Sequence, residues 1–331
     1  MTTKLAIVKI IVPFKNFSLP LFLSSAIVFT APPIVAKSFF RSYNFCSDYN
    51  IFTAIVYIIF EIFMKVVDTV KIKQIRNATL KIEYANKTFL IDAWLMDKQK
   101  FGRFVDIPKI PFRTPDPVKM EIPMPICGLP ESVEEILSGV DYYILTHIHP
   151  DHIDLNFADG TVGAPLDKNK KIFAQDSNDA EILKRSGFKS IEILGENNLD
   201  EIKITKTPAR HGTINPMGAA CGVIFQAPNE KTLYLVGDTI FYEGVQETLE
   251  KFQPDVVILN ACAAELIGNG RLIMNDEDVL SVATVVPNAQ IIISHMDNVA
   301  HATITRHEMR GLLARRNVKY FMPNDGETLT F

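Results

Sequence analysis

Apolar residues fall into short periodic runs from about Val70 to the end of the chain. Residues 79–84 alternate apolar and polar side chains, which is typical of a half-buried strand. A turn at residues 85–87 leads into a second predicted strand, residues 88–92, which ends on the acidic Asp92. Later strands alternate with short amphipathic segments, and this alternation indicates an α/β domain.

The same periodic pattern continues to the C-terminus. The predicted strands are residues 141–146, 232–236, 255–259 and 290–294, and the predicted helices are residues 177–186, 275–286 and 305–316. Thr305 and Glu308 form a capping-box pattern at the start of the last helix. A final hairpin is predicted from residues 318–322 and 327–331. Residues 101–130 are rich in proline and lack a period, so we expect a long loop there, and such loops are often functional.

The first 69 residues differ from the rest of the chain. Three lysines precede an apolar stretch at residues 17–36, and a second apolar stretch covers residues 51–67. A basic start followed by an apolar run resembles a signal peptide or a membrane anchor, although prolines interrupt the first stretch. We therefore predict an apolar extension, residues 1–69, and an α/β domain, residues 70–331. We favour membrane attachment or export over a cytoplasmic location; the alternative is an extension packed on the domain, and fractionation of the full-length protein distinguishes them.

Composition excludes several classes of protein. The 331 residues are 47% hydrophobic and 22% charged, so the chain can bury a sizeable core. The net charge of −4 gives no support for a nucleic-acid surface, which normally shows a basic excess. Four cysteines lie far apart without a CxxC pair, which argues against a dense disulfide framework and against a zinc ribbon.

Three of the seven histidines fall within residues 147–152, directly after an apolar strand. In extended backbone, His147 and His149 project to the same side and can share one cation. Asp151 and His152 continue around the turn and can face a second cation. Neutral imidazole and carboxylate are ligands that zinc and similar metals accept, so this cluster predicts a metal site on a strand-end loop.

Three more candidate ligands lie far along the chain but also follow strand-like or apolar runs. Asp238 directly follows residues 235–237, His295 directly follows residues 290–294, and His211 follows a short segment that ends at Arg210. Strands that end at one edge of a sheet bring such residues together, so we expect them to join the histidine cluster.

The HxHxDH motif, a lone histidine, Gly-Asp-Thr and a strand-end histidine occur here in the order that resembles the metallo-β-lactamase superfamily. The resemblance covers residues 70–331, and the surrounding sequence looks most similar to the ascorbate-6-phosphate-lactonase-like branch. It implies a four-layer αββα sandwich of two mixed sheets.

The resemblance also implies two divalent metal ions, which we expect to be Zn²⁺, with Mn²⁺ or Fe²⁺ as alternatives. The first ion would be held by His147, His149 and His211, the second by Asp151, His152 and His295, and Asp238 would bridge both. Asp92 matches the acid that the family places behind the site. The redox branch of the family has glutamate at the position of His149, so histidine here favours a hydrolase.

Such a site predicts hydrolysis, because two ions about 3.5–4 Å apart can lower the pKa of a bound water from 15.7 toward ~7. We assign catalytic roles to Asp151, Asp238 and His301. Asp238 can accept the proton of the nucleophile. His301 can protonate the leaving group if it reaches the pocket, since a histidine pKa lies near working pH. Asp297 is a further candidate for lining the pocket.

We therefore predict a hydrolase in which a hydroxide bound by two metals cleaves a lactone, phosphoester or thioester of a small anionic molecule. Arg103 and Arg210 are candidates to bind the anionic group, because guanidinium can contact carboxylate or phosphate bidentately. One alternative is a nuclease of the same fold, but the acidic charge makes a long polyanion a poor partner. Another is a metal-bound, membrane-tethered module without activity, against which the complete ligand set argues. The sequence leaves the substrate, the metal used in the cell and the oligomeric state open.

Overall fold

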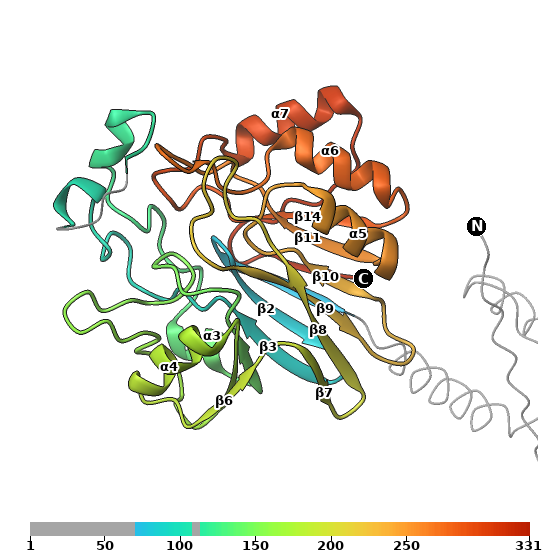
Figure 1. The fold of residues 1–331 in the computed structure, drawn as a ribbon, viewed down its shortest axis with the longest axis horizontal. Coiled ribbons are helices and arrows are strands. Elements are labelled where there is room, and N and C mark those ends of the chain that lie inside the picture. The colour runs from blue at the N-terminus through green and yellow to red at the C-terminus, as the bar shows by residue number, and fades with distance from the viewer. Residues whose placement is uncertain (1–69, 108–112) are drawn as a thin grey trace, which may run out of the picture. The chain divides into compact units, whose positions relative to one another are not determined.

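The computed structural model describes residues 70–107 and 113–331, whose strands form two mixed sheets stacked face to face (Figure 1). The first sheet has the order β15 (Thr328–Thr330), β1 (Lys71–Arg76), β2 (Thr79–Tyr84), β3 (Lys87–Ile91), β4 (Tyr142–Ile144), β5 (Lys171–Ala174) and β6 (Ser190–Ile193). The second has the order β14 (Gln290–Ser294), β11 (Val256–Asn260), β10 (Leu233–Leu235), β9 (Cys221–Gln226), β8 (Ile202–Pro208) and β7 (Glu196–Leu199). A short ribbon pairs β12 (Glu265–Leu266) with β13 (Gly270–Arg271).

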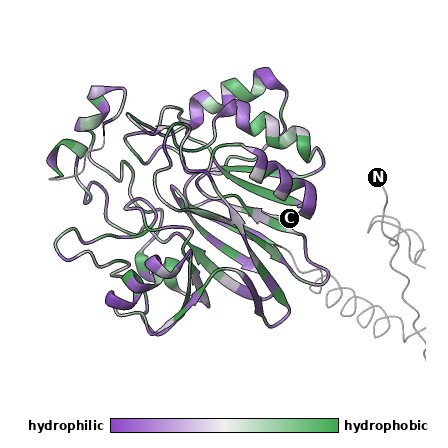
Figure 2. Ribbon diagram, in the orientation of Figure 1, coloured by the Kyte–Doolittle hydropathy of each residue, from purple (hydrophilic) through white to green (hydrophobic). Residues whose placement is uncertain are grey.

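Helices cover the outer face of each sheet. The helices α3 (Val133–Leu137) and α4 (Ser177–Arg185) pack on the first sheet, and α5 (Glu243–Phe252), α6 (Asp276–Val285) and α7 (Arg306–Arg316) pack on the second. These helices are amphipathic in sequence, with apolar and polar residues interleaved along them (Figure 2). The predicted proline-rich loop contains two short 3-10 helices, η2 (Phe104–Asp106) and η3 (Pro117–Glu121).

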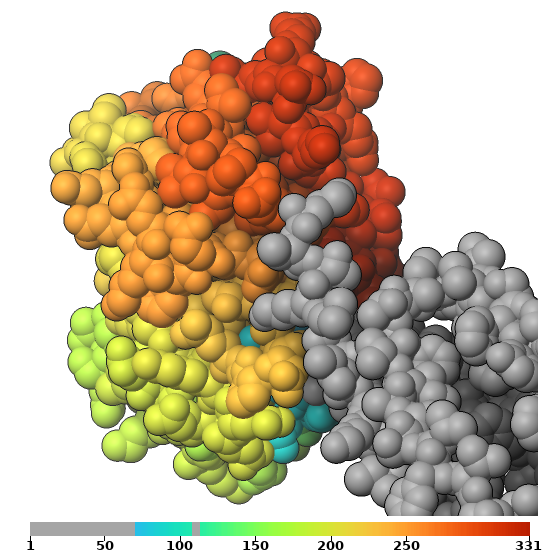
Figure 3. All heavy atoms as spheres, turned by 90° about the vertical axis from the view of Figure 1, so that its right-hand side faces the viewer, coloured from blue at the N-terminus to red at the C-terminus, as the bar shows by residue number. Residues whose placement is uncertain are grey.

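Alternation along the strands builds three apolar layers. In β11, Val256 and Ile258 belong to the core between the two sheets, whereas Val257 and Leu259 belong to the core under α5, α6 and α7. A third core lies between the first sheet and α3 and α4. Seen from the side, the orange and red C-terminal segments form the upper part of the visible face, and the yellow and green segments form the lower part (Figure 3). The four-layer αββα sandwich of two mixed sheets is thereby confirmed.

The predicted C-terminal hairpin is wrong. Phe321 forms a parallel bridge with Ile292 at the edge of the second sheet, whereas β15 pairs with β1 in the first sheet. The turn that separates them is fixed to β1, because Gly326 donates its N–H to the carbonyl of Gln74 at 2.7 Å. The turn residues were recognisable in the sequence, but the two flanking segments pair with different sheets that the sequence does not specify.

The predicted extension, residues 1–69, lies outside the described residues, so its signal, anchor and packed alternatives stay predictions. Within residues 70–107 and 113–331, no helix combines the length and the apolar character needed to cross a bilayer.

Parallel pairing sets one functional edge in each sheet. In the first sheet β3 runs parallel to β4, and in the second β10, β11 and β14 run parallel to one another. Their C-terminal ends therefore lie at a common edge of each sheet, where side chains that follow the strands can converge. Residues 92, 147, 238, 260 and 295 all lie at or just beyond these ends.

We predict that Phe225→Ala lowers the free energy of unfolding by about 3–5 kcal/mol, the usual cost of truncating a buried phenylalanine. Phe225 is fully buried between the sheets, with ring centroids 5.6 Å from Tyr84 and 5.2 Å from Phe89. Urea unfolding followed by circular dichroism measures the loss. Phe321→Ala is the control, because Phe321 is 39% exposed and should cost below about 1 kcal/mol. Equal losses in both variants would contradict this view of the core.

Candidate metal centre

Asp238 stands at the end of β10 because the preceding residue is glycine. Gly237 has a φ of 73°, a left-handed conformation, and a Cβ there would lie 2.3 Å from the carbonyl oxygen of Cys221. No side chain fits at that distance, so only glycine allows the chain to turn here beside β9. The turn buries the Asp238 carboxylate at the edge of the second sheet.

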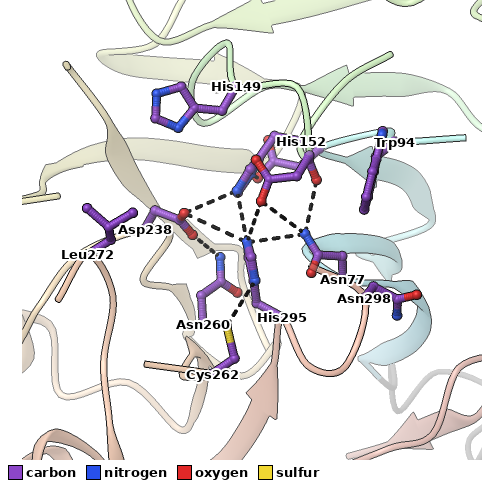
Figure 4. A network of polar contacts seen from close by, with 12 residues as sticks. Asn77, Trp94, His149, His152, Asp238, Asn260, Cys262, Leu272, His295 and Asn298 are labelled. Atoms are coloured by element: carbon purple, nitrogen blue, oxygen red, sulfur yellow. Dashed lines mark hydrogen bonds and ion pairs between the residues drawn. The ribbon is translucent and has the colours of Figure 1, made fainter. Parts of the chain in front are cut away.

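One oxygen of Asp238 faces a ring of imidazoles. Its Oδ2 lies 3.2 Å from Nε2 of His152, 3.7 Å from Nε2 of His211, 3.8 Å from Nε2 of His295 and 3.9 Å from Nε2 of His147. Its other oxygen, Oδ1, accepts a hydrogen bond of 2.7 Å from Nδ2 of Asn260, at the end of β11. The amide of Asn260 therefore fixes the carboxylate so that Oδ2 points into the cluster (Figure 4).

The first three predicted ligands converge on one another. Nδ1 of His149 lies 2.8 Å from Nε2 of His147 and 3.3 Å from Nε2 of His211. His211 donates from Nδ1 to the carbonyl of Leu272 at 3.1 Å, which leaves the lone pair of its Nε2 directed at the other two rings. His149 is partly exposed whereas His147 and His211 are buried, so the cluster meets solvent on the side of His149.

The other three predicted ligands form a second group beside the first. Nε2 of His295 lies 3.2 Å from Nε2 of His152 and 3.3 Å from Oδ2 of Asp151. On its far side, Nδ1 of His295 lies 3.6 Å from the Sγ of buried Cys262. His295 has a left-handed φ of 62° directly after β14, so the chain turns there at the edge of the second sheet.

Asp92 supports both groups from behind. Its Oδ2 accepts from Nδ1 of His152 at 2.8 Å and from the hydroxyl of Thr146 at 2.7 Å, and its Oδ1 accepts from the Thr146 N–H at 2.8 Å. The first contact directs Nε2 of His152 toward Asp238, and the other two hold the backbone next to His147. The structure thus places Asp92 where the sequence analysis expected it.

The donor set fits a pair of divalent cations. Two nitrogens that share a tetrahedral zinc at 2.0–2.1 Å lie about 3.3 Å apart. The separations of 2.8–3.3 Å between ligand atoms within each group are close to this value. Within each of three groups, the ligand atoms all lie within 4.8 Å of one another: His147, His149 and His211; Asp151, His152 and His295; His147, His152 and Asp238. The first two groups contain the residues that the sequence assigned to one ion each, and their role as ligands stays a prediction.

Protonation favours cation binding at most of these positions. Burial and the His211 imidazole lower the pKa of His149 to about 3, so its lone pair is free at neutral pH. Burial opposes ionisation of Asp238, but His152 and His295 hold the pKa of this carboxyl well below its usual range. For His152, burial again opposes charge, yet the Asp238 and Asp92 carboxylates raise its pKa to about 10. A cation at Nε2 of His152 would replace that proton.

His301 lies near the cluster but differs from its expected state. Burial lowers the pKa of His301 to about 4, partly offset by the Asp151 carboxylate, so the ring is neutral near pH 7. The expectation of a pKa near working pH is therefore wrong. Its Nδ1 is buried without a hydrogen-bond partner, and its ring lies 5.5 Å from that of Phe104. A neutral imidazole can accept a proton and pass it on, but it cannot start as the acid.

The other candidates from the sequence lie in different surroundings. Arg103 forms ion pairs with Asp106 at 2.6 Å and Glu121 at 2.8 Å, so its charge is already matched. Arg210 is exposed beside the buried His211. The carboxylate of Asp297 pairs with Arg306 at 3.0 Å and accepts from its backbone N–H at 2.9 Å, which anchors the start of α7.

Sequence reasoning missed the polar residues that hold the ligands in place. Asn77, Thr146, Asn260 and Cys262 all contact one of the seven predicted ligands or Asp92. Asn260 and Thr146 could have been predicted from the sequence, because each ends or follows an apolar strand that stops at the same edge of its sheet. Asn77 lies in a turn at the N-terminal end of the domain, where nothing in the sequence indicated a site.

Comparison with known proteins gives consistent matches. A family model described as a beta-lactamase superfamily domain matches residues 89–296. UPF0173 protein YddR of Bacillus subtilis is 37% identical over 267 residues, which cover 78% of this chain and 99% of that protein. A possible metal-dependent hydrolase from Veillonella parvula has a solved structure that is 33% identical, with a TM-score of 0.71, covering 80% of this chain and 100% of that chain. The solved structure of an isothiocyanate hydrolase from Delia radicum gut bacteria is 35% identical, with a TM-score of 0.68. The match covers 79% of this chain and 98% of that chain.

We predict that Asp92→Asn weakens metal binding by about 10–100-fold, because it removes the carboxylate that orients His152. Zinc titration against a competing chromophoric chelator measures the affinity. Asp200→Asn is the matched control, since the side chain of Asp200 is 69% exposed and forms an ion pair with Lys87 at 3.1 Å, away from the ligands. An unchanged affinity in Asp92→Asn would show that Asp92 does not set the orientation of the ligand.

Proposed function

This chain belongs to the metallo-β-lactamase superfamily of metal-dependent hydrolases, and we propose that it uses two divalent ions to hydrolyse a small molecule. The observation that carries the proposal is the position of Asp238 Oδ2, 3.2–3.9 Å from four imidazole nitrogens that belong to both groups of ligands. A carboxylate oxygen shared in this way can bridge two cations, which favours a dinuclear over a mononuclear site.

Each residue has a definite role in the proposal. His147, His149 and His211 would hold one ion, Asp151, His152 and His295 would hold the other, and Asp238 lies where it could contact both. When bound, the ion pair activates water as a nucleophile at neutral pH and polarises the oxygen or sulfur that becomes negative. Asp238 would accept the proton that the nucleophile loses, because its carboxyl is ionised. The leaving group would receive this same proton through His301, whose neutral imidazole can accept it and pass it on.

An apolar wall beside His301 suggests what the substrate carries. The ring of Phe104 lies 6.3 Å from that of Phe101, which in turn lies 5.4 Å from that of Phe157. Phe157 is 48% exposed, whereas Phe101 and Phe104 are 8% and 6% exposed, so the row leads from the surface into the core beside His301. We propose that an apolar group of the substrate packs along this wall while the reactive carbon or phosphorus faces the metals. An anionic group, as the sequence analysis expected, would meet Arg210 on the exposed side.

Two reaction classes fit this arrangement. The first is cleavage of a lactone, thioester or phosphoester, in which water adds to the carbonyl carbon or to phosphorus and an alcohol or thiol leaves. The second is hydrolysis of an isothiocyanate, favoured by the relative of that name at 35% identity. There, water adds to the central carbon, the carbon–nitrogen bond breaks, and an amine and carbonyl sulfide are released. The lactonase-like branch assignment stays a prediction within the first class.

We predict that the protein purified without chelator holds close to two equivalents of divalent metal per chain, and that Asp238→Asn reduces this number and abolishes turnover. The change keeps the shape of the side chain but removes the charge that both cations share. His149→Ala should abolish turnover as well, because it removes a ligand of one ion. Elemental analysis and assay of each variant test this. A stable single equivalent in the metal-replete wild type would contradict the dinuclear site.

We predict that one class in a panel of lactones, thioesters, phosphomonoesters, phosphodiesters, isothiocyanates and structured RNA is cleaved well, with Zn²⁺ or with Mn²⁺. Within that class, a larger apolar substituent should raise kcat/KM, and Phe104→Ala should remove the gain. Asp238→Asn serves as the inactive control for every substrate. Rapid cleavage of RNA with no activity on small compounds would overturn the proposal and favour the nuclease alternative.

A further inference from the structure

The turn between β1 and β2 reaches into the second group of ligands, although none of its residues belongs to the seven predicted ligands. Asn77 is fully buried in this turn and has a left-handed φ of 52°. Its carbonyl accepts a hydrogen bond of 3.0 Å from the backbone N–H of His295 and another of 2.8 Å from Nε2 of Gln74. The backbone of the turn is thereby joined to the residue that follows β14.

The carboxamide of Asn77 lies between two ligands. Its Nδ2 lies 3.1 Å from the carbonyl oxygen of Asp151, 3.4 Å from Oδ2 of Asp151 and 3.2 Å from Nε2 of His295 (Figure 4). Two of these three neighbours are oxygens that can only accept hydrogen bonds, so the nitrogen and not the oxygen of the amide must face them. Asn77 therefore contacts both ligands, one through its side chain and the other through its side chain and its backbone.

We propose that Asn77 is a positioning residue for the second metal ion: its amide holds the Asp151 carboxylate beside His295, so that both face one cation. Asp151 comes from the loop after β4 in the first sheet, and His295 follows β14 in the second. The two ligands thus belong to different sheets, and the contacts of Asn77 tie them together across the sandwich. By contrast, the side-chain hydrogen bonds of Asn77 within the described residues reach none of His147, His149 and His211.

The inference rests on the proposed two-metal site, and it adds that the two ions depend on Asn77 to different degrees. If Asn77 acts by positioning Asp151 and His295, its loss must weaken the second ion much more than the first. A residue that only stabilised the fold would weaken both ions together, or neither.

Asn77→Gly tests this with little disturbance of the backbone. Glycine adopts the left-handed conformation freely and keeps the carbonyl that binds His295, so the variant removes only the carboxamide. Asn86→Gly is the matched control, because Asn86 is exposed in the β2–β3 turn of the same sheet with a φ of 61°. The full-length protein is stripped of metal and titrated with Zn²⁺ against a chromophoric chelator that resolves the two equivalents, and circular dichroism follows thermal unfolding.

We expect the first equivalent to bind Asn77→Gly as it binds the wild type, and the second to bind about 10–100-fold more weakly. Asn86→Gly should leave both affinities unchanged. An unchanged second equivalent, or an equal loss for both, would overturn the role of Asn77. If Asn77→Gly unfolds at a lower temperature than the wild type, both proteins are titrated well below the lower midpoint, where circular dichroism shows each to be folded. A wild-type protein that binds a single equivalent would overturn the two-metal site itself, an outcome seen before any variant is compared.

Discussion

The crowding of imidazoles around Oδ2 of Asp238 is the constraint on which the rest of the site depends. A charged group is costly to bury unless it is paired and hydrogen-bonded. Here Asp92, Asp151 and Asp238 lie among five histidines, and all of them are at least partly buried. The pKa of His152 is raised, and those of Asp151 and Asp238 are held low, because these groups offset one another. Cations bound at the same lone pairs would offset the carboxylate charge further, so the arrangement favours metal binding.

Convergence of this kind needs rigid supports, and the strand ends provide them. Asp238, Asn260 and His295 lie at the ends of three neighbouring parallel strands, whose spacing is fixed by the backbone hydrogen bonds of the second sheet. Asp92 and His147 follow strands of the first sheet in the same way. Packing of the two sheets through the shared apolar core then sets the distance between the two sets of side chains. Core stability and metal geometry are therefore coupled in this fold.

Several residues at the site adopt a backbone conformation that most side chains avoid. Asn77, Asp92 and His295 have φ values of 52°, 43° and 62°. Asparagine, aspartate and histidine tolerate this left-handed region better than other residues with a Cβ, which explains why these types occur there. The conformation turns each chain sharply at the sheet edge and directs the side chain or the carbonyl inward. Such local strain is common at functional sites, where the surrounding structure holds it in place.

The sequence by itself determined the fold class and the seven candidate ligands. Apolar alternation located β2, and short continuous apolar runs located β3, β10, β11 and β14, because a strand buried on both faces needs apolar residues at successive positions. The histidine motif and the strand-end positions of Asp238 and His295 then indicated a metal site, since these residue types at one sheet edge have few other uses. Proposals drawn from single residues were less secure, as the pKa of His301 and the ion pairs of Arg103 show.

Only the tertiary structure decided which segments pair and which polar residues support the ligands. The segment around Phe321 and strand β15 were predicted to form one hairpin, yet they pair with different sheets. Their pairing depends on the free strand edges that are present in the assembled sandwich. Asn77 and Asp151 are 74 residues apart, and Asn77 and His295 are 218 apart. Contacts over such separations follow from how the two sheets stack. Local sequence patterns carry no record of that stacking, because they encode periodicity and turns but not the partner that each surface meets.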